Sequence, residues 1–220
     1  MNIIEAKEIT KTYTIGTKEV HVLDRVSLTV SEGEFLVIRG SSGSGKTTLL
    51  SLLSGLDRPT SGRIILEKTD ITDQTEDELA RMRNRAIGFV FQSFHLVPSL
   101  TTLENVMFPA ELVPDEKAAE KAENLLRRVG LGHRLYNYPN QLSGGEKQRT
   151  AICRALINSP KIIFADEPTG NLDSENGKAI LSLLTEFHIE QQTTLVLVTH
   201  NDDIAGLADR IVILADGRTL

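Results

Sequence analysis

The stretch that most constrains this chain joins an apolar run, a glycine-rich loop and a second apolar run. The three pieces read EFLVIR (34–39), GSSGSGKT (40–47) and TTLLSLLSGL (47–56). Branched apolar residues favour a strand in the first piece. The third piece has helical character and ends at Gly55. The sequence therefore predicts a strand that leads through a tight loop directly into a helix.

The loop matches the pattern G-x-x-x-x-G-K-[ST], which wraps a nucleotide's phosphates when it follows a strand and opens a helix. Glycines let backbone N–H groups turn toward phosphate oxygens, and a helix N-terminus favours an anion. Lys46 adds a positive charge and Thr47 a hydroxyl for Mg²⁺. The alternative is a glycine-rich turn with an exposed lysine, but a chance match in 220 residues has odds on the order of one in a hundred. We therefore predict that phosphates bind to Gly40, Ser41, Ser42, Gly43, Ser44, Gly45, Lys46, Thr47 and Thr48.

Strand-like and helical segments alternate along the rest of the chain. Helices are expected after Thr75 and Ser143, each followed three residues later by a Glu in capping-box spacing, and from about Ser174. Strands are expected in the first forty residues and in RIIL (63–66), AIGFVF (86–91), KIIFA (161–165), TTLVLVT (193–199) and RIVIL (210–214). Alternating strands and helices imply parallel pairing, so the predicted fold class is α/β.

Charge and composition exclude several classes of function. The 24 Lys and Arg against 30 Asp and Glu leave a net charge of -6, which disfavours non-specific binding to nucleic acid or anionic lipid. The single cysteine, Cys153, excludes an internal disulfide and a cysteine-cluster metal site and suits the cytoplasm. No apolar run approaches the roughly 20 residues of a membrane span. We expect one compact domain over 1–220, soluble by itself and not inserted into a membrane.

Polar residues follow two of the predicted strands at their carboxyl ends. Asp166 and Glu167 follow KIIFA, and adjacent side chains of an extended backbone point to opposite sides. One carboxylate can therefore face Mg²⁺ while the other faces an attacking water. His200 follows TTLVLVT, where it could hydrogen-bond a γ-phosphate. A solvated strand end and a structural histidine are the simpler alternatives, and the nearby phosphate loop favours the functional interpretation.

Five pieces in this order resemble the ATP-binding subunits of ABC transporters: GSSGSGKT, FVFQ, LSGGE, FADEPTGNLD and VTH. The resemblance covers essentially the whole chain, and LSGGE is similar to the signature sequence of that family. It implies a P-loop NTPase (RecA-like) core with an N-terminal antiparallel β subdomain over 1–92 and 158–220. It also implies an inserted helical subdomain over 93–157 that carries the signature.

The resemblance implies roles for individual residues around ATP and Mg²⁺. Tyr13 would stack on adenine, although it could be a surface aromatic. Gln92 would touch Mg²⁺ and the lytic water while sensing a membrane partner, although it could be a polar strand end. Asp166, with Thr47, would hold the metal. The catalytic set would be Glu167 as general base and His200 as γ-phosphate sensor, together with Lys46 and Gln92.

A second group of residues would act on the nucleotide of a partner chain. In the family two chains pair head to tail, and the signature of one faces the phosphate loop of the other. That role would fall to Ser143, Gly144, Gly145 and Glu146, and Asp173 would communicate across the dimer. Ser143 and Asp173 also have the positions of helix N-caps, and both interpretations can hold at once. The family's commonest signature has Gln where this chain has Glu146, which should alter the charge near the ATP ribose.

Within the family, the sequence is most similar to the ATPases of lipoprotein-releasing and macrolide-export systems. That similarity implies a homodimer closing around two Mg-ATP, bound from the cytoplasm to integral membrane subunits that extrude or release lipoproteins, peptides or amphipathic drugs. The alternative is a cell-division type of ABC ATPase, which regulates cell-wall hydrolases and moves no cargo. An ABC ATPase of DNA repair or translation is disfavoured by the acidic charge balance.

Overall fold

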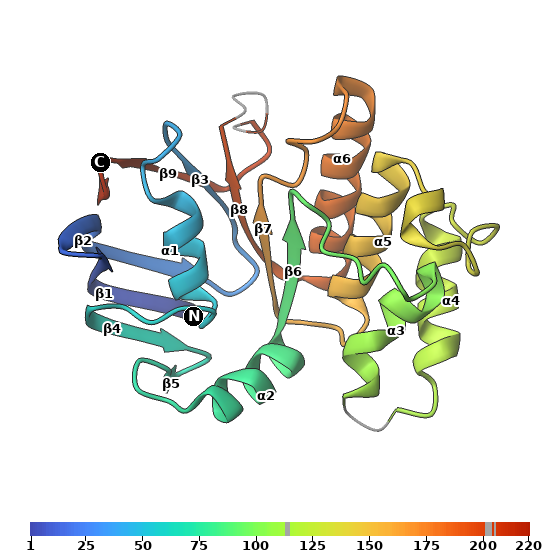
Figure 1. Cartoon of the computed structure of the whole chain (residues 1–220), viewed down its shortest axis with the longest axis horizontal. Coiled ribbons are helices and arrows are strands. Elements are labelled where there is room, and N and C mark those ends of the chain that lie inside the picture. Colours follow the sequence, from blue (N-terminus) through green and yellow to red (C-terminus); the bar gives the residue numbers. More distant parts are fainter. Residues whose placement is uncertain (113–114, 201–203, 205) are drawn as a thin grey trace. The chain divides into compact units, whose positions relative to one another are not determined.

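The computed structural model describes residues 1–112, 115–200, 204 and 206–220 (Figure 1). The chain forms two compact units. The first comprises Met1–Arg83 and Thr193–Leu220, and the second comprises Asn84–Gln192. The α/β class predicted from the sequence is confirmed, because each unit contains parallel strands and helices.

An antiparallel sheet makes up much of the first unit. Its strand order is β2-β1-β4-β5. The long strands β1 and β2 form a hairpin in which Tyr13 lies opposite Val20, and Gly16 supplies the positive φ that its turn requires. The strand bounds are Asn2–Ile15 for β1, Lys18–Ser31 for β2, Ser61–Leu66 for β4 and Thr69–Asp70 for β5. The predicted N-terminal antiparallel sheet is therefore confirmed.

Parallel strands form the other sheet of the first unit. Strand β3 pairs in parallel with β8 on one side and with β9 on the other. Its central residues Leu36, Val37 and Ile38 are fully buried, as expected for a strand covered on both faces. The hairpin from β9 to β10 turns at Asp216 and Gly217, both with positive φ, where the sequence predicts a turn. The bounds are Phe35–Arg39 (β3), Thr194–Thr199 (β8), Arg210–Ala215 (β9) and Arg218–Thr219 (β10).

Helix α1, Lys46–Leu53, contacts strands of both sheets of the first unit, namely β2, β4 and β8. Its apolar side chains Leu49, Leu50, Leu52 and Leu53 are buried. Helix α2, Glu76–Ala86, begins after Thr75, whose hydroxyl and amide both bond the Glu78 carboxylate. The capping box predicted at Thr75 is thus present.

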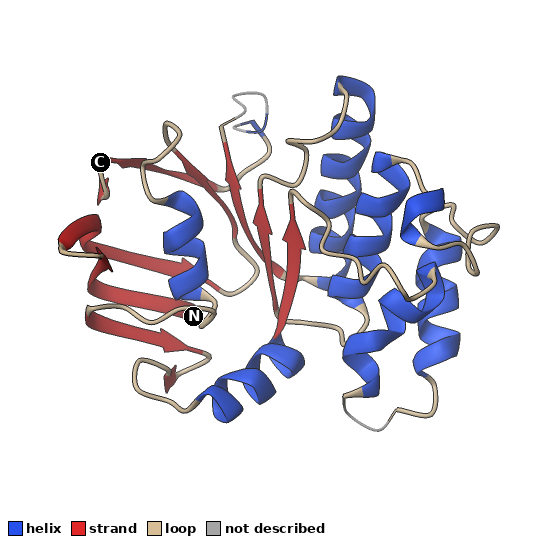
Figure 2. Cartoon of the chain, viewed as in Figure 1, coloured by secondary structure: helices blue, strands red, loops and turns tan. Residues whose placement is uncertain are grey.

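The second unit combines a pair of parallel strands with four helices (Figure 2). Strand β6 pairs with β7, and Phe91 lies opposite Asp166 at the carboxyl end of the pair. Helix α5 is central, since it contacts β6 and the helices α3, α4 and α6. The bounds are Ile87–Phe91 (β6), Ile162–Asp166 (β7), Thr102–Glu111 (α3), Ala118–Arg128 (α4), Gly144–Leu156 (α5) and Ser174–Gln191 (α6), with a short 3-10 helix at Pro139–Gln141.

The compact units differ in their boundaries from the predicted subdomains. The predicted helical subdomain, 93–157, lies within the second unit, which also includes β6, β7 and α6. The division into a core over 1–92 and 158–220 and an insert over 93–157 stays a prediction. The predicted segments themselves appear as helices and strands.

The segment that links β6 to α3 is held by one buried side chain. Asn105 is fully buried, and its Oδ1 accepts a 2.7 Å hydrogen bond from the Val97 amide. Its Nδ2 lies 2.9–3.1 Å from the carbonyl oxygens of Val97, Leu100 and Thr101, which share its two N–H donors. The side chain therefore bonds the Val97 amide and the Leu100 carbonyl, and it adds a contact to the carbonyls of Val97 and Thr101, which also accept the backbone amides of Leu100 and Asn105.

We expect Asn105→Ala to lower the free energy of unfolding by about 2–4 kcal/mol, because the Val97 amide and the Leu100 carbonyl lose their side-chain partner. Urea denaturation followed by circular dichroism measures the change. The matched control is Asn140→Ala, an exposed asparagine of the same unit, with an expected change below about 0.5 kcal/mol. Equal effects of the two substitutions would show that Asn105 does not hold the segment.

Candidate nucleotide-binding site

The loop between β3 and α1 has the backbone shape of a phosphate cradle. Gly43 and Gly45 have φ of +79° and +99°, a region that residues with a side chain rarely adopt. Gly45 is the N-cap residue of α1, and no side chain caps this helix end. No side chain at this N-cap therefore competes with an anion, which the positive dipole end of the helix favours.

Close packing makes two of the loop glycines necessary. A Cβ at Gly40 would lie 2.1 Å from the carbonyl oxygen of Leu214 in β9. A Cβ at Gly45 would lie 2.9 Å from the carbonyl oxygen of Val22 in β2. The Ser44 carbonyl also accepts a hydrogen bond from the Gly217 amide, 3.2 Å away in the β9–β10 turn. The phosphate loop is thus packed against β2, β9 and the β9–β10 turn.

Two polar side chains of the loop are nearly buried within it. Lys46 is 8% exposed, and its Nζ donates to the carbonyl oxygens of Gly40 and Ser41 at 2.9 and 2.8 Å. The Ser44 hydroxyl is buried and has no hydrogen-bond partner in the described structure. A buried hydroxyl without a partner costs free energy that a bound phosphate oxygen would recover. These residues fit a phosphate group, as the sequence predicts.

His200 leaves the sheet at the same end as the phosphate loop. Arg39, the last residue of β3, lies opposite Thr199, the last residue of β8, in parallel register. The following residues, Gly40 and His200, therefore leave neighbouring strands at one edge, where ligands bind in open α/β sheets. His200 is exposed. Its role as a γ-phosphate sensor stays a prediction, which this placement supports.

Tyr13 belongs to the same unit as the loop and is 37% exposed. Its hydroxyl donates a 2.7 Å hydrogen bond to Oδ2 of Asp57, and the Lys11 ammonium lies 4.7 Å from its ring centre. Burial and the Asp57 carboxylate raise the pKa of the Tyr13 phenol, against an opposing interaction with Thr48. Thr48 is in the first turn of α1, so the tyrosine lies beside the helix that the loop opens.

Sequence reasoning did not single out Lys11 or Asp57. Asp57 is 44 residues from Tyr13 in the sequence. Neither Asp57 nor Lys11 belongs to a nucleotide-binding sequence motif. A charged residue two positions before Tyr13 on the same strand, and thus on the same face, was the one available signal.

The acidic strand end lies in the second unit and has a strained backbone. Gln92 and Glu167 directly follow Phe91 and Asp166, which are paired in register at the ends of β6 and β7. Glu167 has a φ of +45°, an uncommon conformation for a residue other than glycine. Functional sites are one of the places where such conformations gather, although Glu167 shares a positive φ with residues of ordinary turns such as Asp216. The structure therefore brings Gln92 and the two carboxylates to one edge of the strand pair.

Gln92 is held by the loop that follows Glu167. Its Nε2 donates to Oδ1 of Asn171 at 3.1 Å, and its backbone carbonyl accepts from Nδ2 of Asn171 at 3.0 Å. A Cβ at Gly170 would lie 2.8 Å from Gln92 Nε2, so glycine lets the side chain lie flat on this loop. The Gln92 side chain is thus held in a defined position, and its role at Mg²⁺ stays a prediction.

The turn Ser143–Gly145 opens helix α5 in the way that its spacing predicts. Ser143 Oγ accepts from the Glu146 amide at 3.2 Å, and Glu146 Oε2 accepts from the Ser143 amide at 2.7 Å. Gly145 is buried, and a Cβ there would lie 2.7 Å from Oδ1 of Asn176 in α6. The capping box and the required glycine are therefore present together.

The negative charge of the Glu146 carboxylate is paired with a neighbouring arginine. Its Oε1 accepts a 3.0 Å hydrogen bond from Nε of Arg134. The Ser143 amide and the Arg134 guanidinium lower the pKa of Glu146, although burial opposes them. The negative charge expected near a ribose is thus paired within the same unit.

Asp173 is the N-cap of α6, in line with one of the two interpretations from the sequence. Its carboxylate accepts from the Asn176 backbone amide at 2.8 Å and from Nδ2 of Asn176 at 2.7 Å. These bonds lower the pKa of Asp173, the backbone amide first. Because Asn176 also contacts Gly145, the signature turn and the Asp173 cap are joined through one side chain.

The Mg²⁺ donors named from the sequence stay a prediction, and they have the oxygen chemistry that this metal prefers. Among the described residues, no three His, Cys, Asp or Glu side chains form a cluster able to hold a metal ion. Thr47 in the first unit and Gln92 and Asp166 in the second offer hydroxyl, amide and carboxylate oxygens. Mg²⁺ prefers oxygen ligands and usually takes only one or two carboxylates besides phosphates and water.

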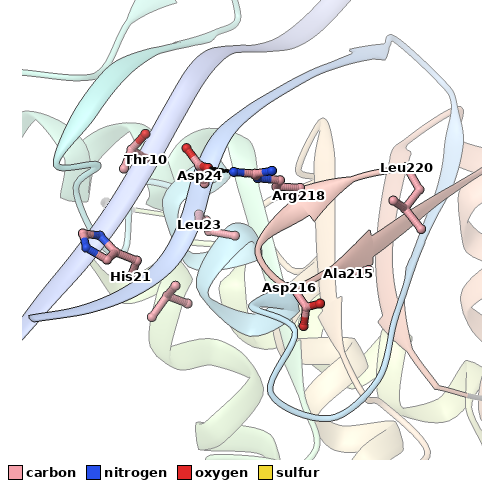
Figure 3. A pocket seen from close by; sticks show the side chains of 9 residues that line it. Thr10, His21, Leu23, Asp24, Ala215, Asp216, Arg218 and Leu220 are labelled. Atoms are coloured by element: carbon pink, nitrogen blue, oxygen red, sulfur yellow. Dashed lines mark hydrogen bonds and ion pairs between the residues drawn. The ribbon is translucent and has the colours of Figure 1, made fainter.

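A separate cavity of about 720 Å³ lies between β2 and the β9–β10 hairpin (Figure 3). Asp24 and Arg218 point toward each other there, with Nε of Arg218 2.9 Å from Oδ2 of Asp24. None of the phosphate-loop residues lines this cavity. Val22 lines it and also contacts the loop at Gly45.

No helix among the described residues is both long enough and apolar enough to cross a membrane.

Comparisons with known proteins find similar sequences and a similar structure. Residues 23–170 match the family model described as ABC transporter. The chain is 49% identical, over 99% of its length, to the macrolide export ATP-binding/permease protein MacB of Syntrophobacter fumaroxidans, of which it covers 31%. It is 47% identical to the lipoprotein-releasing system ATP-binding protein LolD of Desulfotalea psychrophila, with 99% of this chain and 98% of that protein covered. The chain thus spans about a third of the MacB relative.

A solved structure has the same fold. A dimeric ATP-binding cassette in a post-hydrolysis state, bound to ADP and Pi, superposes with a TM-score of 0.91 at 42% identity. The match covers 98% of this chain and 96% of the cassette.

We expect the carboxylate of Glu146 to stabilise the protein in a pH-dependent way. Because its folded pKa is lowered, its contribution is fully present above the unfolded value of about 4.3 and is lost as pH falls through the folded pKa. Glu146→Gln should therefore lower the free energy of unfolding by about 0.5–1 kcal/mol near neutral pH, and by less in acid. Denaturation at several pH values measures this.

The matched control is Glu104→Gln. Glu104 closes a similar capping box with Thr101, and that cap alone lowers its pKa. Its loss should be smaller than that of Glu146→Gln by the contribution of Arg134. A difference between wild type and Glu146→Gln that does not change with pH would contradict the pairing with Arg134.

Proposed function

This chain belongs to the ABC transporter family as an ATP-binding cassette that hydrolyses ATP, and we propose that it is the motor of a membrane complex that extrudes or releases lipoproteins, peptides or amphipathic drugs. One observation carries the proposal. Glycine lies at the N-termini of two described helices: Gly45 is the N-cap of α1, and Gly144 and Gly145 are the first residues of α5, after the N-cap Ser143. Both can bind an anion, and two chains paired head to tail would use both ends on each ATP.

The phosphate loop would bind the nucleotide through its backbone and Lys46. The α1 N–H groups and the partnerless Ser44 hydroxyl would face phosphate oxygens. Lys46 Nζ, now bound to two loop carbonyls, would exchange them for phosphate oxygens. A charge-assisted hydrogen bond is stronger than one to a neutral carbonyl, so this exchange favours binding.

Mg²⁺ would be held by Thr47, Asp166 and Gln92 together with the nucleotide. When bound it supplies positive charge that neutralises the phosphates and orients them for in-line attack. Gln92 suits such a site because Asn171 already holds its amide group in place.

Glu167 would orient the attacking water and accept its proton. The water oxygen then forms a bond to the γ-phosphorus as the bond from phosphorus to the leaving oxygen of ADP breaks. Lys46, His200 and Ser143 of the partner subunit would hold the charge on the γ-phosphate oxygens. The left-handed backbone of Glu167 supports the assignment, since strain of this kind orients a side chain that function requires.

Head-to-tail pairing would complete each site. Ser143, Gly144, Gly145 and Glu146 would bind the phosphates held by the partner's loop, and Asp173 would report across the dimer. Asn176, which contacts Gly145 and binds Asp173, would connect these two functions within one chain. The dimeric cassette bound to ADP and Pi supports the pairing by its similarity.

Coupling to membrane subunits would run through the segment after Gln92. Phe91, Phe94, Leu96 and Leu100 are half-buried and offer apolar surface for a partner helix. Arg154 in α5 donates to the carbonyl oxygens of Phe94 and His95, so the signature helix is tied to this segment. The MacB relatives, named as ATP-binding/permease proteins, support a membrane partner. The cassette would then work from the cytoplasmic face of the membrane, held there by its partner subunits.

We expect Glu167→Gln to reduce ATP hydrolysis by at least about 100-fold, because the general base is lost while the phosphate loop is intact. The variant should still bind ATP and should accumulate as a dimer. Steady-state ATPase assays and light scattering with Mg-ATP measure both effects. Lys46→Ala is the contrasting control, with weakened ATP binding and no ATP-dependent dimer. Near-normal turnover by Glu167→Gln would reject Glu167 as the base.

The nature of the cargo can be tested with the same variant. We expect Glu167→Gln, purified with Mg-ATP from the membranes of its own organism, to retain membrane subunits together with lipoproteins or an efflux partner. Lys46→Ala purified in parallel should retain less of the complex. Mass spectrometry identifies the proteins. Recovery of cell-wall hydrolases with a membrane partner and no cargo would instead mean that the cassette regulates cell-wall cleavage.

A further inference from the structure

The Tyr13 side chain is held by two charged residues from different parts of the first unit. Its hydroxyl donates to Oδ2 of Asp57 at 2.7 Å. The other carboxylate oxygen of Asp57, Oδ1, accepts from Lys11 Nζ at 2.8 Å. The same ammonium lies 4.7 Å from the centre of the Tyr13 ring. Tyr13, Asp57 and Lys11 therefore form a closed triad in which each residue contacts the other two.

The ammonium of Lys11 makes several interactions within this arrangement. Its side chain is 11% exposed, and its Nζ also donates to the Arg58 carbonyl at 2.7 Å. An ammonium has three donors, and two are used by these oxygens while the charge rests against the ring. One face of the ring is therefore occupied by the cation, and Tyr13 is still 37% exposed to a ligand.

Asp57 is anchored to the helix that the phosphate loop opens. The backbone amides of Leu56 and Asp57 both donate to the carbonyl oxygen of Ser51 in α1, at 2.9 and 3.2 Å. The carboxylate also accepts from the Arg58 amide at 2.7 Å. Although burial would raise the pKa of Asp57, hydrogen bonds from Lys11 and Tyr13 outweigh this effect and lower it. Asp57 thus stays ionised and immobile next to α1.

We propose that Asp57 and Lys11 are positioning residues that hold the Tyr13 ring at a set place relative to the phosphate loop, with one face open to a purine base. This inference rests on the proposed stacking of Tyr13 on ATP. A nucleotide has its base and phosphates at a limited range of separations, so a ring tied to α1 is placed to stack while the start of α1 binds phosphate.

The expected gain is one of preorganisation. A free tyrosine loses side-chain entropy when it stacks on a base, and a ring already held by Asp57 and Lys11 does not. Its hydroxyl is used by Asp57, so Tyr13 offers the base its ring and not a hydrogen bond. The contribution should therefore depend on the presence of a base and be absent for phosphates alone.

Titration calorimetry with Mg-ATP and with Mg-tripolyphosphate, which has no base, tests the inference on the full chain. Asp57→Ala should weaken ATP binding roughly 3- to 10-fold, the range expected for one side chain that must be ordered on binding. Tripolyphosphate affinity should be unchanged. In ATPase assays the KM for ATP should rise while kcat is unchanged, because the reacting groups are untouched.

The matched control is Asp70→Ala. Asp70 is also an ion-paired aspartate of the first unit, bound to Arg63 and Thr72, and it contacts neither Tyr13 nor the phosphate loop. It should leave ATP affinity unchanged. Lys11→Met provides a second test variant, since methionine retains the apolar stem of the lysine. It should weaken ATP and spare tripolyphosphate, as Asp57→Ala does.

Substitution of Tyr13 separates this inference from the proposed function. Tyr13→Ala should weaken ATP binding, and Asp57→Ala should have no further effect in that background. If Tyr13→Ala weakens ATP binding but Asp57→Ala and Lys11→Met do not, positioning is wrong and base stacking stands. If Tyr13→Ala has no effect, both stacking and positioning are wrong, while tripolyphosphate binding would still support the phosphate loop.

Loss of tripolyphosphate binding in Asp57→Ala would mean that the substitution disturbs the fold or the loop. Lys11→Met then decides, by the same comparison of the two ligands. Equal weakening of ATP and tripolyphosphate in Lys11→Met would overturn the inference.

Discussion

The left-handed turn at Gly45 is the constraint on which the first unit depends. The chain must pass from the end of β3 to the start of α1 through residues 40–45, and the φ of +99° at Gly45 makes that reversal possible. The carbonyl oxygen of Val22 approaches this glycine so closely that a Cβ would lie 2.9 Å from it. The same geometry that exposes the α1 N–H groups to a phosphate therefore also determines how closely β2 packs against the loop.

The second unit uses glycine in a similar way. Gly145 and Gly170 lie against the amide side chains of Asn176 and Gln92, at distances that leave no room for a Cβ. In each case a functional backbone segment is placed by a polar side chain from another element. Because amide groups both donate and accept, Asn176 also binds Asp173, and Asn171 binds Gln92 at two points. The predicted signature thus lies against Asn176, which binds Asp173, and the predicted acidic strand end is hydrogen-bonded separately through Gln92 to Asn171.

Structural features that depend on residues close together in the sequence are predicted correctly. The capping boxes at Thr75 and Ser143 are present, because they depend only on residues three positions apart. The strands β3, β6, β7 and β8 are short runs of buried apolar residues, and such runs are visible in the sequence. Contacts between distant residues were not predicted: Asp57 with Tyr13 is 44 residues apart, and Arg154 with His95 is 59. Nothing in the local composition of either partner indicates the other.

The family, the α/β class and the phosphate loop follow from the sequence alone, because a glycine loop between a strand and a helix needs particular residues at fixed spacing. Which charged groups pair with one another at the site was decided only by the tertiary structure. Glu146 is predicted to add negative charge near the nucleotide, but Arg134 approaches it and pairs with that charge. Tyr13 has a suitable ring in the sequence, yet only tertiary packing places a cation on one face and a carboxylate at its hydroxyl. Electrostatic interactions act between whichever groups the fold brings close, and their distance along the chain has no part in their strength.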